Sequence, residues 1–454
     1  MWLNLYVTWD ERRKIRMKTE KTYASVFELK GRPKLSQAFP LALQHVVAMI
    51  VGCVTPAIVI AQVAGLSGND RVIFVQSALV IAAISTLIQL FPLGGRIGSG
   101  LPVIMGVSFA YLPSMQAIAG QFDIATILGA QLIGGIAAIF VGIFIKKLRV
   151  LFPPLITGTV VFTIGLSLYP TAVRYMAGGD KSPTYGSWQN WLVAFLTLAV
   201  VIGLNHFAKG ILKLASILIG MIVGYIVAGF FGMLDFSEVA GAGLFQIPQP
   251  LYFGMKFEIT SIVTIVLLFI INSVQAIGDF SATTVGGLDR EPTDKELSGG
   301  IVAYGVTNIF GSLFGGLPTA TFSQNVGIVA TTKVVNRMVL GFAAVIILLA
   351  GFVPKFSALL TTIPQCVLGG ATISVFASIA MTGIKLVVKQ PLTYRNTSIV
   401  GLSVALGMGI TQCPEALGGF PGWVTTVFGK SPVVVTTIAA ILLNVILPAD
   451  KETK

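Results

Sequence analysis

The chain has 454 residues, of which 55% are hydrophobic and only 11% are charged. A soluble domain carries about 25% charged residues, so the composition excludes a soluble protein, and the long apolar stretches exclude a single buried core. The net charge of +12 therefore fits Lys and Arg held on the cytoplasmic side of a membrane better than nucleic-acid binding.

Residues 1–38 are polar and basic, with no apolar segment before a small-residue cleavage site, so we expect a cytoplasmic tail without a cleavable signal peptide. A bilayer-spanning helix needs roughly 20 mostly apolar residues, and the rest of the chain predicts an all-α polytopic membrane protein. The predicted spans are 39–63, 72–91, 101–119, 124–145, 153–172, 190–207, 211–233, 258–282, 298–315, 317–333, 336–354, 357–378, 396–413 and 422–447.

These fourteen spans divide the chain into two halves of seven, 39–233 and 258–447. An extracellular connector, 234–257, separates the halves, and a cytoplasmic tail, 448–454, follows them. With the N-terminus inside, 24 of the 30 Lys and Arg residues lie on the cytoplasmic side. Because an error in the span count would scramble this asymmetry, the charges favour an even number of spans with both termini cytoplasmic.

Two segments, 101–119 and 317–333, are short and interrupted by Gly and Pro. Each begins with Gly-Leu-Pro, and the two tripeptides are 216 residues apart, about half the chain. On this offset Ser108 corresponds to Gln324, and Phe109 to Asn325. Gly-Leu-Pro is also a common turn sequence, but interrupted spans in matching halves are typical of a transporter binding site.

Asp279 is the only carboxylate well inside a predicted span, and Gln275 lies four residues earlier on the same helix face. An intramembrane carboxylate is costly, so we interpret Asp279 as part of a substrate or proton site. The alternative is a carboxylate that caps or bridges helices. His45, the only ionisable side chain of the first span, either relays a proton or donates one neutral hydrogen bond.

Gln324 and Asn325 lie in the second interrupted segment, and each amide offers two donors and one acceptor oxygen. A purine edge presents donors and acceptors in a plane, so an amide can bind it at two points, while Phe109 or Phe322 stacks on the ring. The amides can equally satisfy unwound backbone, since irregular backbone at membrane depth must be buried or line a cavity. Two distant histidines and three scattered cysteines predict no metal site and no cofactor.

The ten residues 324–333, QNVGIVATTK, resemble the signature of the nucleobase–ascorbate transporter family, and Gln44-His45, GVSFAYL (106–112) and IGDFSAT (277–283) are also similar to it. The resemblance implies two inverted seven-helix repeats, a short strand in spans three and ten, and a core and a gate domain. It also implies a homodimer in the cell membrane and proton symport by an elevator-like movement. Gln at the first signature position resembles the xanthine and uric acid branch.

The resemblance implies that Gln275, Gln324 and Asn325 bind the base, that Ser108, Phe109, Phe322 and Ser323 line the site, and that Asp279 and His45 support the network or the proton step. Two positions depart from the family. Gln275 replaces the usual Glu, and Tyr304 stands where an acidic residue is frequent. Natural divergence, an uncoupled facilitator and a deliberate Glu→Gln substitution are all consistent with Gln275.

Three other functions stay open on the sequence. A uracil or other nucleobase carrier has the same fold and a different first signature residue. A related anion carrier of the sulfate-transporter type would lack the Gln-Asn-x-Gly motif. An integral membrane enzyme would need a nucleophile–base set or a metal cluster, which the predicted spans do not offer.

Overall fold

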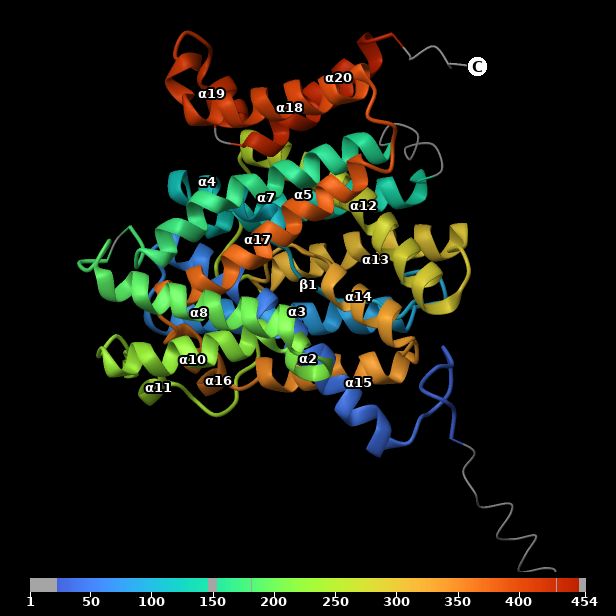
Figure 1. Cartoon of the computed structure of the whole chain (residues 1–454), viewed down its shortest axis with the longest axis vertical. Coiled ribbons are helices and arrows are strands. Elements are labelled where there is room, and N and C mark those ends of the chain that lie inside the picture. Colours follow the sequence, from blue (N-terminus) through green and yellow to red (C-terminus); the bar gives the residue numbers. More distant parts are fainter. Residues whose placement is uncertain (1–22, 146–152, 181, 430, 449–454) are drawn as a thin grey trace, which may run out of the picture.

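The computed structural model describes residues 23–145, 153–180, 182–429 and 431–448 (Figure 1). Most of the two predicted tails, 1–22 and 449–454, lies outside the described residues, as do the basic residues of segment 146–152 and Lys181 and Lys430. Within the described part, helices dominate, and the first helix begins on the same side of the bundle on which the last helix ends.

The elements of the two halves follow one another in the same order: two long helices, a short strand with a half-helix, three further helical units and a broken helix. The first half comprises α2 (Leu35–Val63), α3 (Gly68–Leu90), β1 (Met105–Val107), η1 (Phe109–Tyr111), α4 (Leu112–Gln121), α5 (Ile124–Ile143), α7 (Pro154–Met176), α8 (Trp188–Phe207), α9 (Gly210–Leu214) and α10 (Ser216–Phe230). The second comprises α12 (Ile259–Leu288), α13 (Asp294–Leu313), β2 (Thr319–Thr321), α14 (Ser323–Thr332), α15 (Arg337–Gly351), α16 (Pro354–Thr361), α17 (Gln365–Val387), α18 (Tyr394–Gln412), η3 (Pro414–Leu417), α19 (Gly422–Phe428) and α20 (Pro432–Ile446). A five-residue helix, α11 (Ser237–Gly241), lies between the halves.

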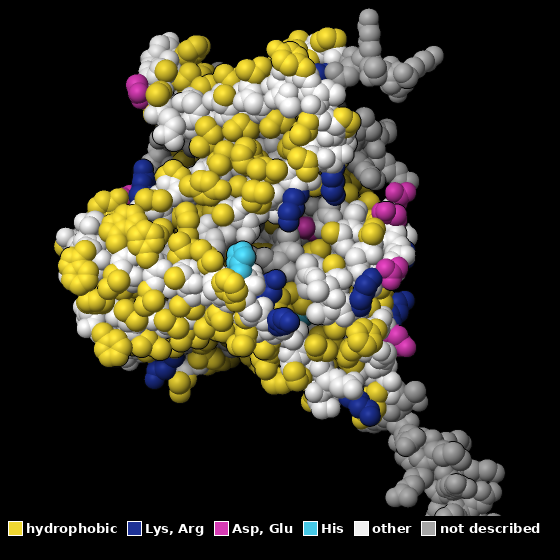
Figure 2. All heavy atoms as spheres, in the orientation of Figure 1, with side chains coloured by type: hydrophobic (Ala, Val, Ile, Leu, Met, Phe, Trp, Pro, Cys, Tyr) yellow, Lys and Arg dark blue, Asp and Glu magenta, His cyan; other side chains and the backbone are white. Residues whose placement is uncertain are grey.

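Among the described helices, seven are long and apolar enough to cross a membrane, by length and composition. An eighth span results if α15 and α16, which meet at 85°, are taken together, and α10 and α20 are shorter apolar helices. The structure is therefore that of an all-helical polytopic membrane protein with broken spans. Hydrophobic side chains cover much of the face in Figure 2, including the region of α8 and α10, as a lipid-facing surface requires.

The predicted span 357–378 is wrong in its bounds. The chain turns by 85° between α15 and α16, and α17 then runs from Gln365 to Val387. Pro354 begins α16 and Pro364 precedes α17, because proline fits the first turn of a helix and disfavours continuation of a preceding one. Hydropathy is continuous across both prolines, so it does not show this break.

The predicted N-terminal tail also ends earlier than expected, since α2 begins at Leu35. The segment before it packs against the start of α15. The side-chain amide of Asn336 donates hydrogen bonds to the carbonyls of Ser25, Glu28 and Gly31 at 3.3, 2.9 and 3.4 Å. One buried amide therefore holds the end of the tail on the helical bundle.

The two interrupted segments meet in the middle of the molecule. β1 and β2 pair antiparallel, with Met105 opposite Thr321 and Val107 opposite Thr319. The predicted short strands in both interrupted spans are thus confirmed. The half-helices α4 and α14 continue from the strands, so each of these units crosses as strand and half-helix.

A two-stranded sheet has two edges, and each edge exposes backbone groups that are costly without partners at membrane depth. Thr86 of α3 serves β1: its hydroxyl accepts from the Met105 N–H at 2.9 Å. Asn308 of α13 serves β2: its Oδ1 accepts from the Thr319 N–H at 2.8 Å, and its Nδ2 donates to the Thr319 carbonyl at 3.1 Å. One polar side chain from each half thus satisfies the neighbouring strand.

Small residues bring α7 and α17 into close contact beside this sheet. A Cβ added to Gly165 would lie 2.4 Å from the backbone nitrogen of Ala380, and one added to Gly383 would lie 2.2 Å from that of Phe162. Such backbone approach is typical of helix pairs in membranes. It fixes the wall that α7 and α17 form on one side of the strands.

Candidate functional site

A cavity of about 100 Å³ lies beside the two strands, between α2, α7, α12, α14 and α17. Its lining includes six of the seven residues predicted to bind or surround substrate, and it adds small and apolar residues from three further helices. The predicted members are Ser108, Phe109, Gln275, Phe322, Ser323 and Gln324; the added members include Gly52, Ile164, Thr321, Val375 and Ile379.

Two glutamine side chains present unused amides to this cavity. Gln275 comes from α12 and is half-buried, and Gln324 comes from the first turn of α14 and is exposed to the cavity. Neither side-chain amide makes a hydrogen bond to any residue within the described ranges. Each therefore has two donors and one acceptor free for a ligand.

Asp279 lies one helical turn beyond Gln275 on α12 and is 8% exposed. Its carboxylate accepts a hydrogen bond from the Thr321 hydroxyl and another from the Ser323 hydroxyl at 2.8 Å. Within the described residues it is the only buried Asp or Glu. The carboxylate thus contacts β2 through Thr321 and the start of α14 through Ser323. Both of these residues also line the cavity.

The cavity also faces the N-terminal ends of two helices that follow the strands. Phe322 precedes α14, so the first N–H groups of that helix have no partner within it. Ser108 precedes η1 and accepts a hydrogen bond from the Ala110 N–H at 3.2 Å. Helix N-termini carry partial positive charge, so both ends favour an oxygen-rich or anionic ligand between them.

The structure places Asn325 away from the cavity. Its side chain is 1% exposed, and its Nδ2 donates to the Nδ1 of His45 at 3.1 Å and to the His45 carbonyl at 3.2 Å. An Nδ1 that accepts a hydrogen bond carries no proton, so this geometry fits a neutral His45. Asn325 and His45 thus connect α14 to α2, and neither contacts Asp279 through a hydrogen bond.

Phe322 and Phe109 supply the aromatic surface. The Phe322 ring lies against Gly52 and Gly106, where an added Cβ would approach ring carbons to 3.0 and 2.5 Å. The Phe109 ring packs edge-on against Phe376, with centroids 5.3 Å apart. The absence of a side chain at Gly106, and to a lesser degree at Gly52, therefore makes room for the Phe322 ring beside the cavity.

Tyr304 is buried below the strands and donates or accepts a hydrogen bond with the Tyr111 hydroxyl. Both rings pack on Phe269, with centroids 5.3 and 5.1 Å from it. Tyr304 of α13 and Tyr111 of η1 thus form a neutral pair of phenols. Asp279 is then the ionisable carboxyl group next to the site.

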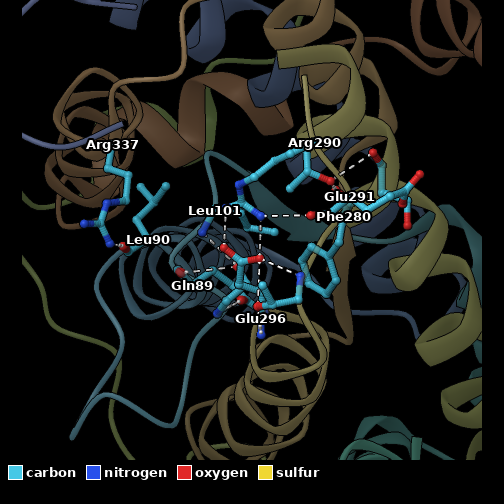
Figure 3. A network of polar contacts seen from close by, with 12 residues as sticks. Gln89, Leu90, Leu101, Phe280, Arg290, Glu291, Glu296 and Arg337 are labelled. Carbon is cyan, nitrogen blue, oxygen red and sulfur yellow. Dashed lines mark hydrogen bonds and ion pairs between the residues drawn. The ribbon is translucent and has the colours of Figure 1, made fainter. Parts of the chain in front are cut away.

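Sequence reasoning missed a polar network at one end of α3, α12 and α13 (Figure 3). Gln89 donates to the Gly300 carbonyl at 2.6 Å and accepts from the Ser99 N–H at 3.0 Å. Arg290 pairs with Glu296 at 2.6 Å, which raises the arginine pKa because the carboxylate stabilises the charged form. The Thr-x-x-Glu spacing at 293–296, a capping box, was the available signal.

Paired strands, opposed half-helices and a repeated element order define the fold of this helical membrane protein. Two solved structures share it. The transmembrane domain of the cyanobacterial bicarbonate transporter BicA matches with a TM-score of 0.58 at 18% identity, over 90% of this chain and 97% of that one. The murine anion transporter Slc26a9, in its inward-facing state, matches with a TM-score of 0.54 at 13% identity, over 96% of this chain and 74% of that one.

Sequence comparison identifies the protein family within this fold. The model of a permease family matches residues 36–416, and the chain belongs to this family, the xanthine/uracil permeases. Uric acid permease PucJ of Bacillus subtilis is 36% identical over 90% of this chain and 92% of its own length. Xanthine permease XanQ of Escherichia coli is 33% identical over 93% of this chain and 94% of its own length. A putative purine permease of Clostridium perfringens is 34% identical over 89% of each chain.

The chain is therefore a transmembrane nucleobase permease and not an enzyme. In the described ranges no group of three or more His, Cys, Asp or Glu residues could hold a metal ion. The candidate functional site is the cavity beside the strands, with its amides, aromatic rings and the adjoining carboxylate.

Gly106→Ala tests the packing of Phe322 against the strand. The new Cβ would lie 2.5 Å from the ring and 2.7 Å from the sulfur of Cys53, and overpacking of this kind costs about 1–3 kcal/mol. We expect substrate uptake to fall about fivefold or more at normal membrane levels. Gly278→Ala is the matched control, since an added Cβ there meets nothing within 4 Å; equal uptake in the two variants contradicts the packing role.

Proposed function

We propose that this permease imports a purine nucleobase, xanthine or uric acid, by proton symport. The observation that carries the proposal is the pairing of two free amides with a buried carboxylate. Gln275 and Gln324 face one small cavity, while Asp279 holds the two hydroxyls next to them. The cavity thus combines a ligand-reading surface with a group that can take up a proton.

A purine fits the chemistry of this lining. Its edges alternate donors and acceptors in one plane, and a primary amide matches such an edge at two points. Phe322 and Phe109 offer ring surfaces, and the N-terminal ends of α14 and η1 favour carbonyl oxygens or a deprotonated ring. The names of the relatives, xanthine and uric acid permeases, support the same class of substrate.

Asp279 supplies the proposed coupling to protons. An ionised carboxylate accepts both hydroxyl hydrogen bonds, whereas a protonated one must donate through one oxygen. Protonation therefore turns one hydroxyl of Thr321 or Ser323 away from the carboxylate, and Ser323 lines the cavity. In this way the charge of Asp279 changes the hydrogen bonds that the cavity offers to the base.

The repeated element order supports fourteen spans in two inverted repeats, 39–233 and 258–447, joined by the extracellular connector 234–257. In this proposal the strands, their half-helices and α2, α3, α5, α12, α13 and α15 form the core domain. The gate domain consists of α7 to α10 and α16 to α20. Movement of the core against the gate carries the cavity across the membrane.

The ion pairs fit the predicted assignment of loops to two sides, and the Lys and Arg asymmetry then favours a cytoplasmic location of both termini in the cell membrane. Arg71 pairs with Glu238, and Lys256 with Asp123, between segments that the charge pattern assigns to the outside. Lys333 pairs with Asp289 at 2.8 Å, between segments assigned to the inside. These three ion pairs thus each join residues on one predicted side of the membrane. Apolar side chains on the outer face of α18, among them Leu402 and Leu406, offer a surface for a homodimer.

Gln324→Ala tests the substrate assignment. Removing the amide leaves a purine donor or acceptor unpaired, which costs about 1–3 kcal/mol, so we expect the affinity for labelled xanthine or uric acid to fall about tenfold or more. The measurement is uptake in cells together with membrane abundance. Gln390→Ala, which removes an amide far from the cavity, is the control. Unchanged uptake in Gln324→Ala refutes the site assignment.

Asp279→Asn tests the coupling. In the wild type we expect accumulation of purine to rise as the outside pH falls, because inward proton flow drives it. The Asn variant keeps the size of the side chain but cannot ionise, so accumulation against a gradient and its pH dependence are lost. Asp235→Asn, in the connector, is the control. If accumulation in Asp279→Asn still depends on pH, another group carries the proton. If the wild type does not accumulate purine against a gradient, the protein is a facilitator.

A further inference from the structure

A second, larger cavity of about 380 Å³ lies at the end of the bundle opposite the start of α2 and the end of α20. It is formed by the last turns of α2 and α7, the middle of α4, the first residue of α17 and the loop after α7, which lies on the left in Figure 1. Its lining is mainly polar: Gln62, Val63, Gln116, Ala117, Thr171, Arg174, Tyr175, Asp180 and Gln365.

The position of this outer cavity relative to the central one follows from three shared helices. Gly52, Ile164 and Val375 line the central cavity. Gln62, Arg174 and Gln365, which line the outer cavity, lie ten residues away on the same three helices, always toward the same end. At a rise of about 1.5 Å per residue, the outer cavity is roughly 15 Å from the central cavity along the helix axes.

Buried polar atoms in the outer cavity have no partner. Tyr175 is 8% exposed, and its hydroxyl is buried without a hydrogen bond. The side-chain oxygen of Gln365 is buried without one as well. Buried polar groups are hydrogen-bonded in nearly all proteins, so two unpartnered atoms in one cavity point to a ligand.

The loop after α7 packs closely against Gln365 at the edge of this cavity. Gly179 has a φ of +85°, and a Cβ there would lie 1.4 Å from the side-chain oxygen of Gln365. Gln116 accepts a hydrogen bond from Thr171 at 3.3 Å, which joins α4 to α7. Arg174 is 60% exposed and pairs with Asp180 at 3.6 Å, and because a guanidinium has five N–H donors, this pair leaves donors for an oxygen-rich ligand at the mouth of the cavity.

We propose that this outer cavity is a second purine-binding site, occupied before the base reaches the central cavity. The inference rests on the proposed function. Amides and a phenol can read the hydrogen-bonding edge of the same planar base, as Gln275 and Gln324 do in the central site. Arg174 favours the oxygen-rich or deprotonated edge of xanthine or uric acid. The outer site raises the local concentration of substrate at the entrance and thereby lowers the KM.

The first experiment measures occupancy directly. Val63→Cys places a thiol in the outer lining, in a Cys413→Ser background, because Cys413 is the exposed cysteine of the described chain. We expect xanthine or uric acid to slow labelling by a membrane-impermeant thiol reagent at least about threefold. The same protection is expected when the central site carries Gln324→Ala. Lys355→Cys, exposed outside the lining, is the control and gains no protection.

The outcomes separate the two proposals. Protection that disappears with Gln324→Ala, while the unliganded labelling rate and the membrane level stay constant, overturns the outer site and leaves the central site in place. Absence of protection in a chain that takes up purine also overturns the outer site. Absence of purine uptake by the wild type, together with absence of protection in Val63→Cys, overturns the proposed function, and the outer site with it.

A second measurement uses kinetics. Tyr175→Phe combined with Gln365→Leu removes the unpartnered polar atoms and keeps most of the packing. Loss of neutral hydrogen bonds made before translocation raises the KM for purine about three- to tenfold and leaves the maximal rate unchanged. Tyr169→Phe, on the same helix but outside the lining, is the matched control. A lower maximal rate with an unchanged KM indicates a purely structural role and contradicts the proposal.

Discussion

The need to satisfy backbone groups inside a membrane governs this structure. Two spans are interrupted by the strands β1 and β2, and the half-helices α4 and α14 follow these strands at the cavity. The backbone groups that the interruptions expose are paired between the two strands. Met105 to Val107 pair with Thr319 to Thr321, while Thr86 and Asn308 satisfy the two outer edges. Without these bonds, each unpaired group would cost several kcal/mol in lipid. The pairing of the strands and these two side chains thus support the opposed half-helices.

The chemistry of the site follows from that arrangement. The strands bring Ser108 and Gln324 to one cavity, and the start of α14 carries Ser323 against the carboxylate of Asp279. A change in the charge of that carboxylate must rearrange hydroxyls that face the ligand. Gln275 adds an amide but no second titratable group, and Tyr304 pairs with Tyr111 as a neutral phenol. In the proposed mechanism, proton coupling therefore depends on one buried acid.

Much of the site could be predicted from sequence because polar residues within apolar spans are few and each needs a task. That reasoning selected Gln275, Gln324 and Asp279, while the two short strands followed from the family resemblance. It did not show that Asn325 turns toward His45, since neighbouring residues on a half-helix face different sides and sequence does not tell which side meets the cavity. It missed Thr86 and Asn308, because Thr and Asn within a helix often bond to their own helix backbone. It misplaced the helix after Pro364, where hydropathy continues across a sharp turn.

The central claim is that Asp279 links purine binding to protonation through Thr321 and Ser323. Calorimetry of purine binding to the purified protein, in buffers of different ionisation enthalpy, measures the number of protons taken up with the base. The wild type is expected to take up protons, in a number that changes with pH, and Asp279→Asn is expected to bind the same purine without proton uptake. Equal proton uptake by both proteins would contradict this account.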